Sequence, residues 1–324
     1  MIFEKNRVLD LINSELTKRK YGNSPAELYD PISYILSLGG KRLRPFLTLF
    51  SNYLYQDNYT VALKPALAIE VFHNFTLMHD DIMDKAPLRR NKVTVHEKWN
   101  NNIAILSGDV MLVKAYDLLL DVEKDLLPET LRLFNKCAAE VCEGQQLDMN
   151  FEKRANVSEE EYLNMIKLKT AVLLGLSMRI GALIGGASKE DADKLEAFGV
   201  NIGMGFQLMD DLLDVYGDQK KFGKMVGGDI AANKKTFLYI KALELSRGET
   251  KKLLLKSFES GSGSKDKVKS VTHIYDKLNI RSVTEEKINL YFQTGLKKLS
   301  LVNAPIYKKN MLKEFVITLM TREN

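Results

Sequence analysis

Apolar residues recur at every third or fourth position along most of this 324-residue chain, and this spacing constrains its fold more than any other feature. Such a period places apolar side chains on one face of an α-helix. Alternation of apolar and polar residues, which would indicate strands, is scarce, and only seven prolines are present. The pattern predicts an all-α fold. Helices are expected over residues 6–20, 65–84 (with Pro65 at the first helical position), 104–123, 129–149, 158–186, 189–216 and 234–258.

The composition is typical of a globular protein, with 45% hydrophobic and 27% charged residues. A net charge of +5 is too small to indicate nucleic-acid binding, and no linker or repeat is evident, so we expect one domain over residues 1–324. The most apolar stretch, residues 170–186, is interrupted by Arg179 and is too short for a membrane span. The first twenty residues are charged throughout and lack a signal-peptide core, which favours a cytoplasmic location.

The segment HDDIMDKAPLRR, residues 79–90, concentrates aspartates just before two arginines. Asp80 and Asp84 are four residues apart, so on a helix both project from one face, together with His73 and Thr76 upstream. A single DDxxD segment is more often a solvated acidic helix end. The preceding residues are largely apolar, however, which favours a lined cavity.

A second DDxxD segment, with Asp210, Asp211 and Asp214, follows another apolar helical pattern. Two acidic clusters on buried helices repel each other unless cations lie between them. Ligand sets made of oxygen alone suit Mg²⁺, which prefers carboxylates, water and substrate phosphates. The pair of motifs therefore predicts a diphosphate bridged by magnesium.

These segments resemble the trans-prenyltransferase, or polyprenyl diphosphate synthase, family over nearly the whole chain. The matching segments occur in the family's order: GGKRLRP (39–45), HDDIMDKAPLRR (79–90), GQQLD (144–148), KT (169–170), FQLMDD (206–211) and FGKMVGGDIAANKKT (222–236). The resemblance implies a single bundle of many helices around a central cavity, and a homodimer. It also implies a head-to-tail condensation of isopentenyl diphosphate with an allylic diphosphate.

The resemblance also implies roles for individual residues. Three Mg²⁺ ions are expected on the allylic diphosphate, held by Asp80, Asp84 and Asp210, while Asp81, Asp211 and Asp214 bind bridging waters or orient the ligands. The diphosphate of isopentenyl diphosphate is expected to bind Lys41, Arg44, His73 and Arg90, and the allylic diphosphate is expected to touch Arg89. Lys169, Thr170 and Gln207 are expected beside the allylic diphosphate and the nascent cation, and Lys224 and Lys234 around the leaving diphosphate.

Product length depends on the residues that precede the first aspartates. Thr76 lies one helical turn before Asp80 and is small, whereas Phe75 flanks the path of the growing chain and Phe72 lies deeper. Periodicity alone favours ordinary core aromatics at both positions. In the family, short-chain synthases often carry an aromatic residue five positions before the first aspartate, as Phe75 does here. This predicts a C15 to C20 product, with C20 geranylgeranyl diphosphate preferred.

The chain departs from the family pattern after its arginine pair, where Asn91 and Val93 replace glycine and proline. These changes are expected to affect loop closure and not the ligands. Three rivals remain open: a class I terpene cyclase, a non-catalytic subunit of a heteromeric synthase, and a nucleic-acid binder. A cyclase does not need GGKRLRP, and a silent subunit typically lacks aspartates in one motif, whereas both motifs are intact here.

Overall fold

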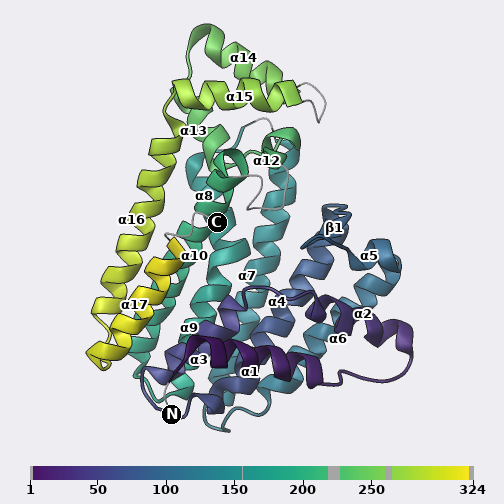
Figure 1. The fold of residues 1–324 in the computed structure, drawn as a ribbon, viewed down its shortest axis with the longest axis vertical. Helices are drawn as coiled ribbons and strands as arrows, with labels where there is room; N and C mark the ends of the chain where they lie inside the picture. The colour runs from purple at the N-terminus through teal and green to yellow at the C-terminus, as the bar shows by residue number, and fades with distance from the viewer. Residues whose placement is uncertain (1–2, 155, 218–226, 260–264, 321–324) are drawn as a thin grey trace. The chain divides into compact units, whose positions relative to one another are not determined.

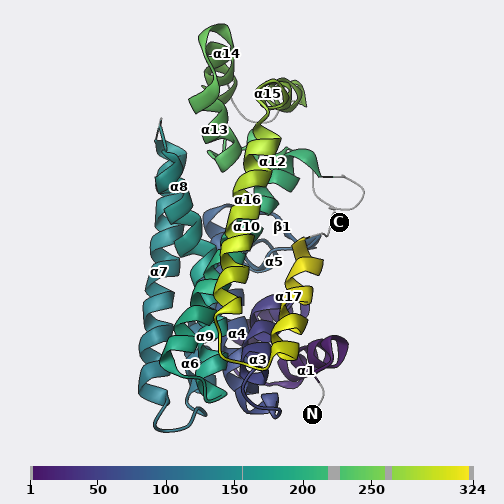
Figure 2. The same ribbon diagram turned by 90° about the vertical axis from the view of Figure 1, so that its left-hand side faces the viewer.

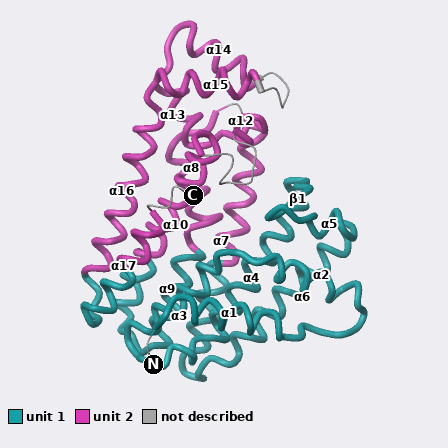
Figure 3. The backbone as a smooth tube through the Cα atoms, viewed as in Figure 1, with its two compact units in different colours: residues 1–137, 173–196, 301–312 teal, residues 138–172, 197–300, 313–324 magenta. Residues whose placement is uncertain are grey.

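The computed structural model describes residues 3–154, 156–217, 227–259 and 265–320, and these are almost entirely helical (Figures 1 and 2). The prediction of an all-α fold is confirmed. The chain divides into two compact units (Figure 3). One comprises residues 1–137, 173–196 and 301–312, and the other comprises residues 138–172, 197–300 and 313–324. The expectation of a single domain stays a prediction.

The first unit contains the N-terminal helices and a small hairpin. Its complete elements are α1 (Lys5–Lys18), α2 (Ala26–Ser37), α3 (Leu43–Tyr53), η1 (Tyr59–Ala62), α4 (Leu63–Met83), β1 (Leu88–Arg89), β2 (Lys92–Val93), α5 (Val95–Lys98) and α6 (Asn101–Leu119). Four of the five boundaries between the units fall within α7 (Leu127–Lys153), α9 (Val172–Ile184), α10 (Lys189–Tyr216) and α17 (Ile306–Met320), and the fifth follows residue 300.

The second unit contains α8 (Glu159–Ile166), η2 (Lys167–Ala171), α12 (Gly228–Ala231), α13 (Phe237–Leu245), α14 (Gly248–Glu259), α15 (Lys265–Lys277) and α16 (Ile280–Ser300). A Ser158–Glu161 capping box starts α8, because each residue satisfies a backbone N–H of the other. The segment η2 is a π-helical turn between α8 and α9. Such turns are rare and often occur at functional sites.

The centre of the first unit is the pair of helices α4 and α6, which contact each other along their lengths. They run antiparallel. The His79 imidazole approaches the Ile105 carbonyl at 3.1 Å near the end of α4, and Lys64 at its start pairs with Asp121 at 2.9 Å. The α4 side chains Leu67, Ile69 and Phe72 are almost fully buried. Helix α4 is therefore fixed, with its aspartates at one end.

Three local predictions are corrected by the structure. Helix α4 begins at Leu63, two residues before Pro65, because the missing N–H of proline is tolerated anywhere in a helix's first turn. The helix expected over 234–258 is two helices, separated at Ser246, whose backbone is extended, and Gly248, which has a left-handed φ of 54°. The loop expected after Asp84 contains the antiparallel pair β1–β2.

The hairpin accommodates the departures at Asn91 and Val93. Arg90 and Asn91 form its two-residue turn, and both have left-handed backbones, with φ of 52° and 60°. Asparagine tolerates this conformation better than most residues, and paired positive φ values match the twist of a hairpin. Val93 pairs with Leu88, and its carbonyl accepts a hydrogen bond from the Tyr34 hydroxyl at 2.7 Å.

Among the residues that the structure describes, no helix combines the length and the apolar character needed to cross a membrane.

Candidate functional site

The first aspartate motif lies at the C-terminal end of α4. Asp80 is half-buried, Asp81 is buried, and Asp84 is exposed and caps the helix by donating its N–H to the Asp80 carbonyl at 2.8 Å. The helical spacing places Asp80 and Asp84 on one side and turns Asp81 inward. The motif thus separates into two accessible carboxylates and one that is enclosed by protein.

The enclosed carboxylate of Asp81 positions Arg89. The guanidinium of Arg89 donates to both Asp81 oxygens at 2.8 to 3.0 Å, and it lies 3.8 Å from Asp80. Burial raises the pKa of Asp81, although the bidentate pairing with Arg89 opposes this rise. The structure therefore couples the second aspartate of the motif to the first arginine that follows it.

The basic segment 39–45 divides into residues with different environments. The Arg42 guanidinium is buried, pairs with Glu70 at 2.7 Å and donates to the Leu36 carbonyl at 2.6 Å. Lys41 is exposed, while Arg44 is half-buried on the first turn of α3. Two of the three cations are thus placed to meet a ligand, and the third holds the fold together.

The structure brings Arg44, His73 and Arg90 together. The Arg44 guanidinium lies 3.1 Å from His73 Nε2, and since a guanidinium only donates, that nitrogen is the acceptor of a neutral imidazole. Arg90 donates to the Gly39 carbonyl. A Cβ on Gly40 would lie 2.8 Å from the Arg90 guanidinium, so this glycine allows the arginine to approach the backbone.

The electrostatics of this group favour an anion. Burial lowers the pKa of His73 well below its usual value, and the neighbouring Arg44 and Arg90 lower it further. Burial also lowers the pKa of Arg44, whose Nε is buried without a hydrogen-bond partner in the described residues. Several cations are therefore gathered around a neutral histidine, and a bound anion would relieve both their repulsion and their desolvation.

An aromatic wall lies before the aspartates on α4. Phe72 is buried and packs edge-on against Phe134 of α7 with ring centroids 5.1 Å apart. Phe75 is half-buried, 5.6 Å from Phe72, and Thr76 is half-buried with its hydroxyl bound to the His73 carbonyl at 2.8 Å. The predicted chain-length residues thus share one surface of α4, with Phe75 partly accessible.

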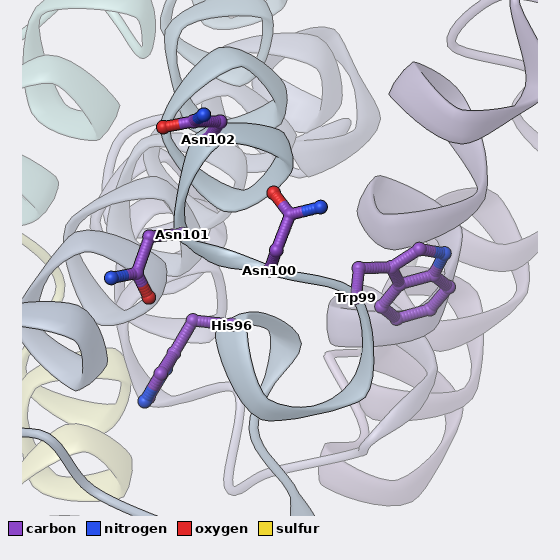
Figure 4. Close-up of a pocket in the computed structure, with 5 residues that line it drawn as sticks. All are labelled: His96, Trp99, Asn100, Asn101 and Asn102. Carbon is purple, nitrogen blue, oxygen red and sulfur yellow. The ribbon is translucent and has the colours of Figure 1, made fainter.

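A shallow pocket of about 400 Å³ opens beside α5 and the start of α6 (Figure 4). His96, Trp99 and three consecutive asparagines line it, and their side chains diverge from one another in the close-up. Asn100 is occupied in capping α6, because its side chain accepts the Ile103 N–H at 2.9 Å. The pocket contains none of the predicted site residues.

The second aspartate motif lies near the end of α10, in the other unit. Asp210 is exposed, Asp211 is buried and Asp214 is half-buried. The Tyr162 hydroxyl donates to Asp211 at 2.5 Å. Burial and the nearby Asp229 carboxylate raise the pKa of Asp211 to about 8. As in the first motif, the middle aspartate is enclosed and makes contacts with protein.

Asp214 holds the start of α12. Its Oδ2 accepts the backbone N–H of Asp229 at 2.9 Å, and its own carbonyl accepts the N–H of Gly227 at 2.6 Å. Lys234 is exposed and lies 4.0 Å from the Asp229 carboxylate. Lys224 lies outside the described residues, so its predicted role stays a prediction.

The π-helical turn η2 carries Lys169 and Thr170. Lys169 pairs with Asp148 at 2.6 Å, and the Thr170 hydroxyl donates to the Gln207 side-chain oxygen at 3.1 Å. Gln207 in turn donates to Asp211 at 3.2 Å. Thr170 and Gln207 therefore form a hydrogen-bonded chain that ends on the second aspartate motif, whereas Lys169 pairs separately with Asp148.

Sequence reasoning missed several residues that position these groups. Gly144 of the GQQLD segment allows close packing, because a Cβ there would overlap the Lys169 backbone. Asp148 also belongs to a recognised segment, but its pairing with Lys169 was not predicted. Tyr162 carries no sequence signal, since a tyrosine on an amphipathic helix is ordinarily a core residue.

The donor set fits magnesium bound through a substrate. Within the described ranges, no three or more His, Cys, Asp or Glu side chains are grouped to hold a metal ion. A self-contained metal cage is therefore not formed by these residues. Mg²⁺ commonly binds one or two carboxylates together with substrate phosphates, and Asp80, Asp84 and Asp210 offer oxygen donors of this kind.

Comparisons with known proteins identify the family. The polyprenyl synthetase family model matches residues 25–275. The chain belongs to the polyprenyl synthetase family. It is 38% identical to a geranylgeranyl diphosphate synthase of Sulfolobus acidocaldarius, over 92% of this chain and 91% of that protein. It is 40% identical to a short-chain isoprenyl diphosphate synthase of Methanocaldococcus jannaschii, over 85% and 83% of the two chains.

Solved structures agree with this assignment. A crystal structure of a geranylgeranyl pyrophosphate synthase matches with a TM-score of 0.94 and 43% identity, and the match covers 100% of both chains. The predictions of a trans-prenyltransferase family member and of an enzyme that transfers prenyl groups are confirmed.

Proposed function

We propose that this polyprenyl synthetase condenses isopentenyl diphosphate head-to-tail with an allylic diphosphate, with Mg²⁺ bound, and makes geranylgeranyl diphosphate. The observation that carries the proposal is the group formed by Arg44, His73 and Arg90. Without a ligand, the arginines around the neutral imidazole repel one another. A bound diphosphate would offset this repulsion, because its oxygens accept charge-assisted hydrogen bonds. Isopentenyl diphosphate supplies such a group.

Residues of the first unit bind and orient isopentenyl diphosphate. Lys41 is exposed at the end of a glycine-rich turn, where its ammonium meets the diphosphate as a point charge. Arg44 and Arg90 donate hydrogen bonds to the same group, and His73 donates through Nδ1 while Nε2 accepts from Arg44. Arg89, held by Asp81, is directed toward the allylic diphosphate.

The residues of the second unit act on the allylic substrate. The Thr170 hydroxyl and the Gln207 amide present polar atoms, and their hydrogen bond fixes the orientation of both. Together with Lys169 they lie beside the allylic cation that forms when the C–O bond breaks. Lys224 and Lys234 stabilise the negative charge that develops on the departing diphosphate.

Asp80, Asp84 and Asp210 would hold Mg²⁺, and we propose that three ions bind. The metal would supply additional positive charge for the diphosphate. The double bond of isopentenyl diphosphate then attacks the cation, forming the new C–C bond. The proton that is lost passes to the released diphosphate, which acts as the base. No side-chain nucleophile is required, because the double bond supplies the electron pair for the new C–C bond. Asp81, Asp211 and Asp214 contribute by orienting neighbouring groups.

The proposed C20 product is supported by the aromatic wall on α4. Phe75 is half-buried five positions before Asp80, and Phe72 closes the surface behind it through its contact with Phe134. The Sulfolobus acidocaldarius relative is named a geranylgeranyl diphosphate synthase, in agreement with this choice. A chain that grows along α4 would stop when its end meets these rings.

We also propose a homodimer. Leu106, Val113 and Leu120 are exposed by 57%, 57% and 60%, and their spacing of seven residues places them on one side of α6 and its C-cap, Leu120. An apolar row of this kind is normally covered by another protein surface. Val113→Glu should convert the dimer into monomers in light scattering. Cytoplasmic location stays a prediction, which cell fractionation tests.

The function is tested by incubating the purified protein with isopentenyl diphosphate and allylic diphosphates of five, ten and fifteen carbons. Products are separated by chain length, with and without Mg²⁺. We expect C20 diphosphate only when both substrates and Mg²⁺ are present. Diphosphate release from the allylic substrate alone, with a cyclic hydrocarbon product, would instead identify a terpene cyclase.

A further inference from the structure

Lys234 lies directly after the short helix α12, in a turn that fixes its backbone. Its N–H donates to the Asp229 carbonyl at 2.9 Å, and the N–H of Asn233 donates to the Ile230 carbonyl at 3.2 Å. Asn233 has a left-handed backbone, with φ of 58°. Two such hydrogen bonds around a left-handed residue form a Schellman motif, which ends many helices. The backbone at Lys234 is therefore set by the way in which α12 ends.

The left-handed position of this turn carries a side chain that makes a contact of its own. A glycine is usual at this position of a Schellman motif, and asparagine is the less common choice. The side-chain oxygen of Asn233 accepts a hydrogen bond from the Lys267 ammonium of α15, 34 residues away. Lys267 is only 8% exposed, and its ammonium lies 5.2 Å from the centre of the Phe258 ring. Lysine is rarely buried, so a buried lysine directed at this turn is a notable feature of the second unit.

The packing of α15 against α12 supports this contact. A Cβ on Gly227, the residue just before α12, would overlap the side chain of Val268. Val268 follows Lys267 directly, so the close approach and the lysine contact come from the same turn of α15. At the start of α12, Asp214 accepts the N–H of Asp229 at 2.9 Å. The α12 segment is therefore held at its start by the second aspartate motif and at its end by α15.

The residue that follows Lys234 is held by a different helix. The ammonium of Lys235 donates to the carbonyls of Phe151 and Glu152 at 2.9 and 3.2 Å, more than 80 residues earlier in the chain. Both carbonyls lie in the last turn of α7, where helix carbonyls need partners from outside the helix. A cation there also meets the negative end of the helix dipole. Lys235 therefore caps α7 and fixes the chain on the far side of Lys234.

We propose that Lys235 and Lys267 are positioning residues for Lys234, which direct its ammonium at the departing diphosphate. This inference rests on the proposed function, in which Lys234 stabilises that group. The Lys234 side chain is 43% exposed, and its ammonium lies 4.0 Å from the Asp229 carboxylate. A flexible lysine loses entropy when a ligand orders it. Contacts on both neighbouring residues restrict the backbone before the substrate binds, and such preorganisation makes the charge more effective.

The experiment measures the rate constant for a single turnover, with isopentenyl diphosphate, a fifteen-carbon allylic diphosphate and Mg²⁺. Lys267→Met removes the ammonium and keeps an apolar stem beside Phe258, and the rate constant should fall by about 3- to 30-fold. Lys235→Met should have an effect of similar size. KM for isopentenyl diphosphate should not change in either variant. Lys269→Met, an exposed change on α15, is the matched control and should react at the wild-type rate.

Coupling to Lys234 separates positioning from a general loss of stability. If both lysines act through Lys234, neither Lys267→Met nor Lys235→Met should lower the rate further in the Lys234→Ala background. Lys267→Met should also have no further effect in Asn233→Gly, which keeps the left-handed backbone and removes the acceptor. Losses of equal size with and without Lys234 overturn the inference, and so does a wild-type rate in either Lys267→Met or Lys235→Met.

Hydrogen exchange in the substrate-free protein gives a second readout that does not need turnover. The Lys234 N–H should exchange about 3- to 30-fold faster in Lys267→Met than in the wild type and in Lys269→Met. Unchanged exchange overturns the inference. A wild type that forms no prenylated product would refute the proposed function, and exchange alone would then decide whether Lys267 holds Lys234 in place. A Lys234→Ala variant that reacts at the full rate would overturn both the role of Lys234 and the inference.

Discussion

Arg89 and Asp81 form a bidentate ion pair, with contacts of 2.8 to 3.0 Å, between the hairpin and the buried side of α4. The pair links an aspartate that has little contact with solvent to an arginine that is 22% exposed. We therefore propose that Asp81 acts on substrate through Arg89. This relationship gives the middle aspartate of the first motif a role that differs from that of its neighbours.

Asp81→Asn should lower kcat/KM for the allylic substrate by at least about tenfold, because Arg89 loses its bidentate partner. The free energy of unfolding should fall by about 1 to 3 kcal/mol. Steady-state kinetics and urea unfolding measure the two effects. Asp109→Asn, on the exposed face of α6, is the control and should leave both unchanged. An unaltered allylic kcat/KM in Asp81→Asn would refute the positioning role.

Asp80→Ala and Asp210→Ala should each abolish turnover without unfolding the protein. Both carboxylates are accessible, and removing one relieves repulsion within its motif in the metal-free protein. The midpoint of thermal unfolding should therefore hold or rise, while product formation falls by about 10³-fold or more. If either variant turned over near the wild-type rate, its assignment as a magnesium ligand would be wrong.

The two basic sets should affect different substrates. Lys41→Ala and Arg44→Gln should raise KM for isopentenyl diphosphate by about 10- to 100-fold, because each loses charged contacts with its diphosphate. Lys234→Ala and Lys224→Ala should instead slow ionisation of the allylic diphosphate, seen as a lower rate constant in single-turnover measurements. Equal changes in the same substrate's KM across all four variants would contradict the two-pocket assignment.

Phe75→Ala should lengthen the product beyond C20, since it opens the partly accessible end of the aromatic wall. Phe72→Ala is expected to lengthen it further, but deletion of this buried ring costs about 3 to 5 kcal/mol, so Phe72→Leu is the milder change. Product chromatography measures the outcome, with Phe50→Leu in the core of α3 as the control. A wild-type product of C30 or longer would refute the prediction. An unchanged product in the variant that combines Phe75→Ala with Phe72→Ala would also refute it.

The free energy of unfolding should fall as the pH drops below about 6.5, because of the titration of His73. Its folded-state pKa is lowered by burial and by Arg44, so the unfolded chain takes up a proton that the folded protein does not. The contribution to stability is complete above pH 6.5 and decreases by up to about 1.4 kcal/mol per pH unit below it.

His73→Gln should remove this component, because glutamine accepts from Arg44 without titrating. Urea unfolding between pH 5 and 8 measures the difference, with the exposed His273→Gln as the control. Wild-type and His73→Gln stabilities that fall in parallel over this range would show that His73 is not responsible.

Several of the helices and the spacing of the two aspartate motifs were predictable, because they depend on neighbours in the sequence. The apolar period of α10 predicted a helix over 189–216, which the structure shows at Lys189–Tyr216. The spacing of Asp80 and Asp84 likewise requires only the helical repeat. The break at Ser246 was not predicted, since the apolar period continues across it.

Contacts between distant residues were decided by the tertiary structure alone. Nothing local distinguishes Arg42 from Arg44, but packing buries Arg42 against Glu70, 28 residues away, and leaves Arg44 beside His73. Tyr162 meets Asp211 across 49 residues of sequence. Helical periodicity is encoded in a few adjacent residues. The partner of a buried polar group depends instead on how complete helices pack, because a buried group must form a hydrogen bond with a donor or acceptor that the fold brings within reach.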